Sequence, residues 1–161
     1  MSELDIVAVH EAGHAVASML WDGPTVSRSA LVAGNSHHAG LTEYDNDDFE
    51  LRAEVITAGP VAEAMHTAGH RPTTSDLFRA FDGYGHLDYA TLTASGRPIP
   101  TDVVALTLER VWPAVLDVAH ELSARREVGP GTVLAALRVP RGRQCDSYIS
   151  GLRTGLHSLR R

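Results

Sequence analysis

The first twenty residues show the hydrophobic period of an α-helix. Apolar side chains recur at spacings of three and four over residues 6–20, and a second stripe of small apolar residues runs beside them. A helix that is apolar on nearly all sides is typical of a protein core. Ser2 and Asp5 predict a capping box at its start, and the Asp-Gly-Pro of residues 22–24 predicts its end.

The pattern changes to short, strand-like segments after residue 25. Residues 26–32 and 39–44 each have the length of a short strand, and Gly34-Asn35-Ser36 between them has the composition of a turn. The sequence therefore predicts a small β hairpin or edge strand.

Helical periodicity returns further along the chain. A second helix is expected from about Asp47 to Met65, with a bend at Pro60, because the apolar period continues through that proline. The other expected helices are a single turn at residues 76–81, a short helix at 86–94, a long helix from Thr101 with a kink at Pro113, and a short helix at 132–139 after a turn at 129–131. These elements predict a mainly α fold of the α+β class.

A change in composition after Pro140 predicts a separate C-terminal tail. Residues 141–161 contain five arginines and one acidic residue, Asp146. We expect one domain over residues 1–139 and a basic, partly disordered tail over residues 140–161.

Composition narrows the class of protein. The 161 residues are 43% apolar and 21% charged, as in a folded globular domain, and the net charge of −6 gives no reason to expect nucleic-acid binding. The sequence contains neither the run of about 18 apolar residues that a membrane span needs nor a signal peptide, so we expect a cytoplasmic protein. A single cysteine, Cys145, excludes an internal disulfide and a cysteine-rich zinc site.

The first predicted helix carries an H-E-x-x-H motif, formed by His10, Glu11 and His14. A spacing of four places both imidazoles on one face of the helix, where they can bind one zinc ion. Glu11 lies about 100° around the helix axis, so its carboxylate can approach a water molecule without taking a ligand position. Polar side chains are costly in a buried helix, which favours a functional site over a pair of hydrogen-bonded core histidines.

Two histidines do not complete a catalytic zinc site, which needs a third protein ligand. The extended H-E-x-x-H-x-x-G-x-x-H pattern is absent, because Ala17 and Leu20 stand where glycine and the third histidine would be. A carboxylate later in the chain is therefore needed.

The chain resembles the peptidase domain of the FtsH family of ATP-dependent zinc metalloproteases. Residues 10–16 (HEAGHAV) are similar to the active-site helix of that family, 58–63 (AGPVAE) to its second helix, and 112–137 to its closing helices. Residues 40–42 lie where the family has a strand beside the substrate cleft. The resemblance implies a compact, mostly helical zincin-like fold, a single zinc ion, and an aspartate as third ligand at the start of a later helix.

Two aspartates match the third ligand that the resemblance implies. Asp88 is favoured, because its spacing to the closing helices fits better, and Asp76 is the alternative ligand. Helix capping is the other role that suits Asp76. Glu63 is a third candidate, by analogy with zincins that use a glutamate.

We therefore expect a zinc metalloendopeptidase in which His10, His14 and Asp88 hold Zn²⁺ and Glu11 is the general base. The substrate is a peptide or protein, bound in extended form along residues 40–42. Because the sequence shows neither an ATPase module nor a membrane anchor, we expect it to differ from the family in both respects. The alternatives are a non-proteolytic binding or regulatory module of the same fold, and a zinc hydrolase that acts on a small biosynthetic amide.

Overall fold

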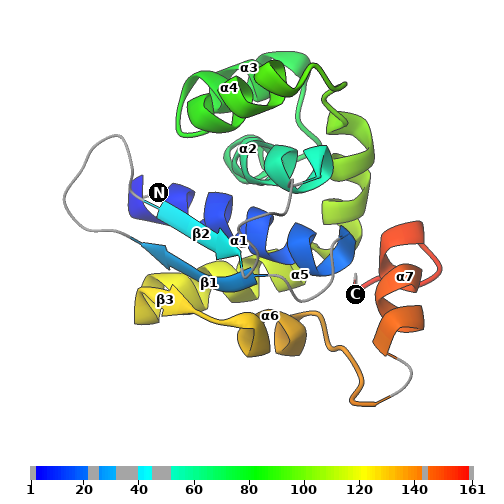
Figure 1. The fold of residues 1–161 in the computed structure, drawn as a ribbon. Helices are drawn as coiled ribbons and strands as arrows, with labels where there is room; N and C mark the ends of the chain where they lie inside the picture. The colour runs from blue at the N-terminus through cyan, green and yellow to red at the C-terminus, as the bar shows by residue number, and fades with distance from the viewer. Residues whose placement is uncertain (1–2, 22–25, 32–39, 45–51, 143–144, 160–161) are drawn as a thin grey trace.

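A computed structural model describes residues 3–21, 26–31, 40–44, 52–142 and 145–159 of the chain. Figure 1 shows the fold, which is mainly helical with a small sheet and confirms the α+β class. The helices are α1 (Glu3–Trp21), α2 (Ala53–Ala68), α3 (Thr74–Asp82), α4 (His86–Ser95), α5 (Thr101–Arg125), α6 (Pro130–Ala136) and α7 (Cys145–Thr154). The strands are β1 (Val26–Leu31), β2 (Gly40–Tyr44) and β3 (Glu127–Val128).

Helix α1 is buried along its length, as its apolar pattern predicts. Residues 7–20 are all buried, with the sheet, α2 and α5 packed around them. Gly13 allows a close approach to α2, because a Cβ atom there would lie 2.6 Å from the carbonyl oxygen of Ala58 and 2.7 Å from Cβ of Ala62. The helical pair α3–α4 covers the side of α2 opposite α1 (Figure 1).

The sheet lies against α1 and has the order β2-β1-β3. Strands β1 and β2 are antiparallel, with Ser29 opposite Thr42 and Ala30 opposite Leu41, so the predicted hairpin strands are confirmed. The predicted turn at residues 34–36 lies outside the described residues, as do the predicted cap at Ser2, the predicted end at 22–24 and the first residues of the second predicted helix.

The long helix α5 has the predicted kink. Val111 has φ −111° and ψ 15°, which is not helical, two residues before Pro113. A proline inside a helix has no N–H to donate and its ring crowds the preceding turn, which explains the break. Helix α2 continues through Gly59 and Pro60 to Ala68, so the continuation that its apolar period predicts is confirmed, and the bend expected at Pro60 stays a prediction.

Elements α3, α6, α7 and β3 differ from the expectation. Helix α6 begins at Pro130, inside the predicted turn at residues 129–131, and ends at Ala136, and helix α7 was not predicted. The predicted single turn at residues 76–81 is part of a longer helix, α3, which begins after Thr73 and is fixed there by a capping box with Asp76. Strand β3 was not predicted, because two residues carry no alternating pattern. It forms by pairing Glu127 and Val128 with Ala30 and Ser29 of β1.

Helix α7 and Leu159, which lie in the predicted basic tail over residues 140–161, pack on the domain. Leu152 of α7 and Leu159 are buried in the same core cluster as α1 and α5. Arg153 donates a hydrogen bond to the carbonyl oxygen of Leu20 at 3.4 Å, and Arg110 donates one to the carbonyl oxygen of Arg153 at 3.0 Å. The arginines of this segment favour exposure to solvent, whereas its buried leucines hold it on the domain. None of the described helices combines the length and hydropathy needed to span a membrane.

The Leu152→Ala variant tests this packing. Leu152 is completely buried, so its truncation is expected to lower the free energy of unfolding by about 2–5 kcal/mol in chemical denaturation. The matched control is Leu156→Ala in the same segment, since Leu156 is 83% exposed and the change should stay within about 0.5 kcal/mol. Equal stability of the two variants would show that the segment does not pack on the core in solution.

Candidate metal centre

Helix α1 places His10 and His14 one turn apart on the face that meets α2. Both side chains are buried, and their Nε2 atoms lie 3.2 Å apart. Gly59 of α2 lies directly against them, because a Cβ atom there would lie 2.3 Å from Nε2 of His14 and 2.7 Å from Nε2 of His10. The absence of a side chain at this position therefore leaves room for both imidazoles.

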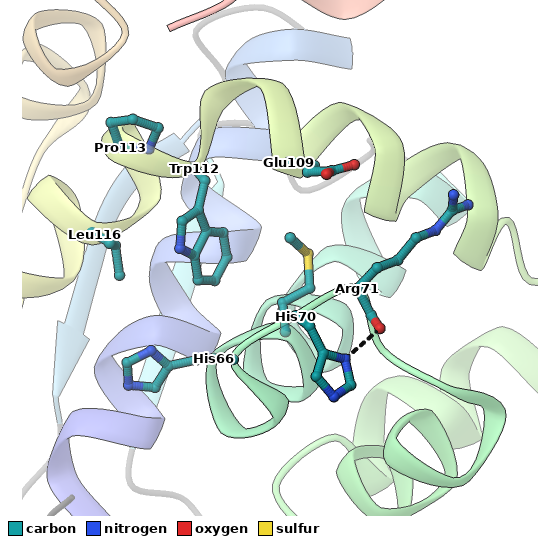
Figure 2. Close-up of a pocket in the computed structure, with 9 residues that line it drawn as sticks. His66, His70, Arg71, Glu109, Trp112, Pro113 and Leu116 are labelled. Atoms are coloured by element: carbon teal, nitrogen blue, oxygen red, sulfur yellow. Dashed lines mark hydrogen bonds between the residues drawn. The ribbon is translucent and has the colours of Figure 1, made fainter. Parts of the chain in front are cut away.

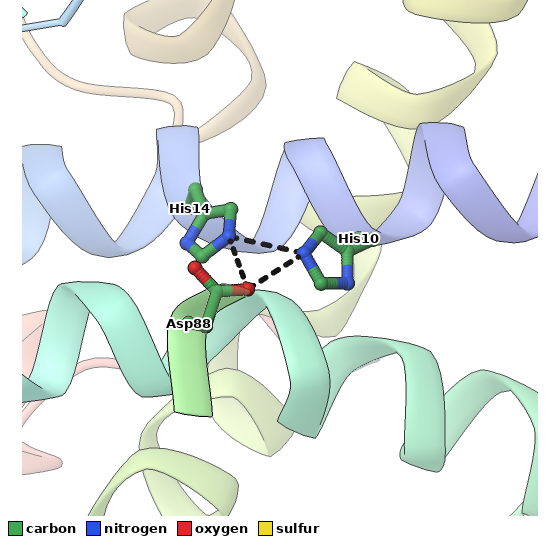
Figure 3. A group of neighbouring side chains, drawn as sticks. All are labelled: His10, His14 and Asp88. Carbon is green, nitrogen blue, oxygen red and sulfur yellow. Dashed lines mark hydrogen bonds and ion pairs between the residues drawn. The ribbon is translucent and has the colours of Figure 1, made fainter. Parts of the chain in front are cut away.

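Asp88 reaches the same point from the first turn of α4, as Figure 3 shows. Its Oδ2 atom lies 3.1 Å from Nε2 of His10 and 3.5 Å from Nε2 of His14. Gly85 lets α4 begin this close to α2, since a Cβ atom there would lie 2.6 Å from Cγ of Pro60. The three possible ligand atoms all lie within 4.8 Å of one another.

The outer nitrogens of both imidazoles have acceptors. Nδ1 of His14 donates to the carbonyl oxygen of Val55 at 2.9 Å, and Nδ1 of His10 donates to a carboxylate oxygen of Glu63 at 3.1 Å. Neutral imidazoles that donate through Nδ1 have a lone pair on Nε2. In this neutral form, two such lone pairs would face the Asp88 carboxylate, and a cation between the three groups would relieve the repulsion. Two imidazole nitrogens and one carboxylate oxygen suit Zn²⁺, with a position left open for water.

The charges around His10 also favour a cation at this point. Burial disfavours the charged form of His10, but the hydrogen bonds to Asp88 and Glu63 and the charge of Glu11 outweigh burial and raise the pKa of His10 to about 10. Burial acts in the same way on His14, and the charge and hydrogen bond of Asp88 raise its pKa too. Burial would raise the pKa of Asp88, but the two histidines hold it well below its usual range.

Glu11 leaves α1 toward the sheet and not toward α2. It is 7% exposed, and the hydroxyl of Thr42 on β2 donates to its Oε2 atom at 2.6 Å. Ser29 of β1 lies behind Thr42, with 3.0 Å between the two hydroxyl oxygens. The separation that the spacing predicts is confirmed: the imidazoles face one side of α1 and the carboxylate faces another.

The structure separates the candidate third ligands by their positions. Asp88 joins the two histidines, whereas Asp76 caps α3, where it accepts hydrogen bonds from the backbone N–H of Thr73 at 2.8 Å and from its hydroxyl at 2.6 Å. These hydrogen bonds hold the pKa of Asp76 below its usual value. Glu63 lies behind His10 as a hydrogen-bond partner.

The sequence reading missed several supporting groups. It did not assign the orienting role of Glu63, the carbonyl group of Val55, the hydroxyls of Thr42 and Ser29, or the close approach of Gly59. One signal was available, because Gly59 and Glu63 are four residues apart and therefore share a helix face. The others depend on which elements pack together.

A cavity of about 490 Å³ lies between the C-terminal end of α2 and the kinked part of α5 (Figure 2). Trp112, Pro113 and Leu116 form its apolar wall, and His70 donates a hydrogen bond to the carbonyl oxygen of Arg71 at its rim, at 2.8 Å. None of the three residues of the candidate metal centre lines this cavity. Among the described residues, the side chains that line this cavity do not form a group of three metal ligands like that of the candidate metal centre.

The Glu63→Gln variant tests the orienting role of Glu63. The substitution keeps the size of the side chain and removes the charge that faces Nδ1 of His10, so zinc affinity is expected to fall about 10–100-fold. Competition with a chromophoric chelator measures this affinity. Glu54→Gln, in the first turn of the same helix, is the matched control and should leave it unchanged. Unchanged affinity in Glu63→Gln would show that His10 does not need this carboxylate.

Comparison with known proteins adds no family assignment. The chain matches no protein-family model, and no curated protein shows significant similarity to it. The resemblance to the FtsH family therefore remains a prediction from the motifs, and the function is argued from the geometry of the site.

Proposed function

We propose that this protein is a zinc-dependent metallopeptidase. The observation that carries the proposal is the convergence of Nε2 of His10, Nε2 of His14 and Oδ2 of Asp88 within 4.8 Å, with Glu11 on the same helix. These three residues would hold the zinc ion. A purely structural zinc site has four protein ligands, whereas three ligands and a nearby carboxylate are typical of hydrolytic sites.

The chemistry divides between the metal and Glu11. Zinc, when bound, supplies Lewis-acid chemistry by acidifying water and polarising the carbonyl group of the scissile bond. Glu11 takes the proton of the attacking water and passes it to the leaving amine. Its carboxylate is held by Thr42, and its burial excludes bulk water that would compete for the proton.

Strand β2 is the part of the fold that best suits an extended peptide. It is one of the two outer strands in the order β2-β1-β3, and its Thr42 side chain contacts Glu11. A peptide that adds to the outer edge of β2 would form backbone hydrogen bonds with the strand and pass beside the general base. This arrangement favours a peptide or protein substrate over a small amide.

The test is the zinc content of the purified, untagged chain together with its hydrolysis of a peptide library. We expect about one zinc ion per chain, because the three protein ligands form a single site. A chelator should remove the metal and the hydrolysis together, and added zinc should restore both. Mass spectrometry of the intact protein and fluorescence of quenched peptides give the two readouts.

Two results would overturn the proposal. If the chain lacks metal and does not take up added zinc, the H-E-x-x-H motif of α1 does not form a metal site, and a binding module becomes the better assignment. A chain that binds zinc and cleaves no peptide in the library would keep the metal site and lose the peptidase assignment.

A further inference from the structure

Two hydroxyls connect the sheet to Glu11. Thr42 of β2 lies between Glu11 and Ser29, with Oγ1 at 2.6 Å from Oε2 of Glu11 and 3.0 Å from Oγ of Ser29. Ser29 is completely buried. It stands directly opposite Thr42 in the β1–β2 register, so the backbone pairing itself brings the two hydroxyls together.

The two hydrogen bonds that link Ser29, Thr42 and Glu11 can only be donated in the direction of Glu11. A threonine hydroxyl has a single hydrogen, and Thr42 donates it to the carboxylate of Glu11. Ser29 must then donate its own hydrogen to Oγ1 of Thr42, because no second hydrogen is available between the two oxygens. Ser29 therefore fixes the rotation of the Thr42 hydroxyl, and Thr42 fixes one oxygen of Glu11.

Gly40 holds the same carboxylate from a second position on β2. A Cβ atom at Gly40 would lie 2.4 Å from both Cγ and Oε1 of Glu11. The backbone of β2 therefore restricts the position of Oε1, while the hydroxyl of Thr42 holds Oε2 by a hydrogen bond. Gly40 and Thr42 are two residues apart, so both face the same side of the strand.

We infer that Thr42 is a positioning residue for the general base, with Ser29 behind it. Its hydroxyl holds Oε2 of Glu11 and so fixes the orientation of the carboxylate that accepts the proton. This inference rests on the proposed function. A side chain fixed before the reaction does not need to reorganise during it, so the loss of the hydroxyl should slow turnover more than it weakens substrate binding.

The test compares Thr42→Val with Thr42→Ser, using the peptide that the wild-type protein cleaves fastest in the library. Valine keeps the shape of threonine and removes the hydroxyl, so kcat is expected to fall about tenfold or more, with KM within about threefold. Serine restores the hydroxyl and should keep kcat within about threefold of the wild type. Zinc content should be unchanged in both variants, since Thr42 is not among the candidate ligands.

Thr107→Val is the matched control for hydroxyl removal. Thr107 is 2% exposed and donates to the carbonyl oxygen of Val103 within α5, so its loss should leave kcat unchanged. A Thr42→Val variant with wild-type kcat, in a protein that hydrolyses peptides, would overturn the positioning role and leave the proposed function intact.

A second readout does not depend on activity. A double-mutant cycle of Thr42→Val and Glu11→Ala compares the melting temperatures of the full chain. We expect the melting temperature of the double variant to fall by less than the sum of the decreases in the two single variants, because both changes remove the same hydrogen bond. Additive losses would overturn the inference directly. If the wild-type protein hydrolyses no peptide, the proposed function fails and the positioning role fails with it, whatever the cycle shows.

Discussion

The Glu11→Gln variant is expected to bind zinc as the wild type does and to lose peptide hydrolysis by about 10²–10⁴-fold in kcat. The amide keeps the size of the side chain and can still accept the hydrogen bond from Thr42. It cannot take the proton from the attacking water. The loss should therefore appear in kcat, while the zinc content and the melting temperature stay close to those of the wild type.

Three measurements on one preparation check this expectation: zinc by mass spectrometry, melting temperature by circular dichroism, and initial rates on the library peptide. Glu121→Gln is a suitable control, because Glu121 pairs with Arg125 of its own helix and its side chain is 41% exposed. Wild-type rates in Glu11→Gln would rule out Glu11 as the base. Loss of zinc would show instead that Glu11 belongs to the ligand set.

The local parts of the site could be predicted from the sequence because they depend on helix geometry alone. His10 and His14 share a face, and Glu11 points away from it, whatever surrounds α1. The preference for Asp88 over Asp76 came from the family resemblance. The structure brings Asp88 to the histidines and Asp76 to the start of α3, and the role of Asp88 as a ligand stays a prediction.

The supporting groups could not be predicted, because they depend on contacts between elements. The hydrogen bond from His10 to Glu63 requires α1 and α2 to pack closely, which Gly13 allows only when it faces Ala58. The contact of Thr42 with Glu11 requires the sheet to lie across α1. Strand β3 and the packing of Leu152 depend in the same way on partners far away in the sequence.

The Asp88→Ala variant is expected to lose zinc, with an affinity more than about 100-fold below that of the wild type. The loss of a hydrogen-bond partner behind a ligand typically costs 10–100-fold, and the loss of a ligand should cost more. Hydrolysis should fall with metal occupancy. Asp88→Asn keeps an oxygen atom at the same place without the charge, so its affinity should lie between those of the wild type and Asp88→Ala.

Asp76→Ala is the matched control, since it removes the other aspartate that fits the sequence pattern. Its carboxylate accepts from Thr73 and pairs with Arg79, so its loss should weaken the start of α3 and leave zinc affinity unchanged. If Asp76→Ala lost zinc and Asp88→Ala kept it, the third ligand would be misassigned. If both variants kept zinc, two histidines and another group would hold the metal, and Glu63 would be the first carboxylate to test because it already contacts His10.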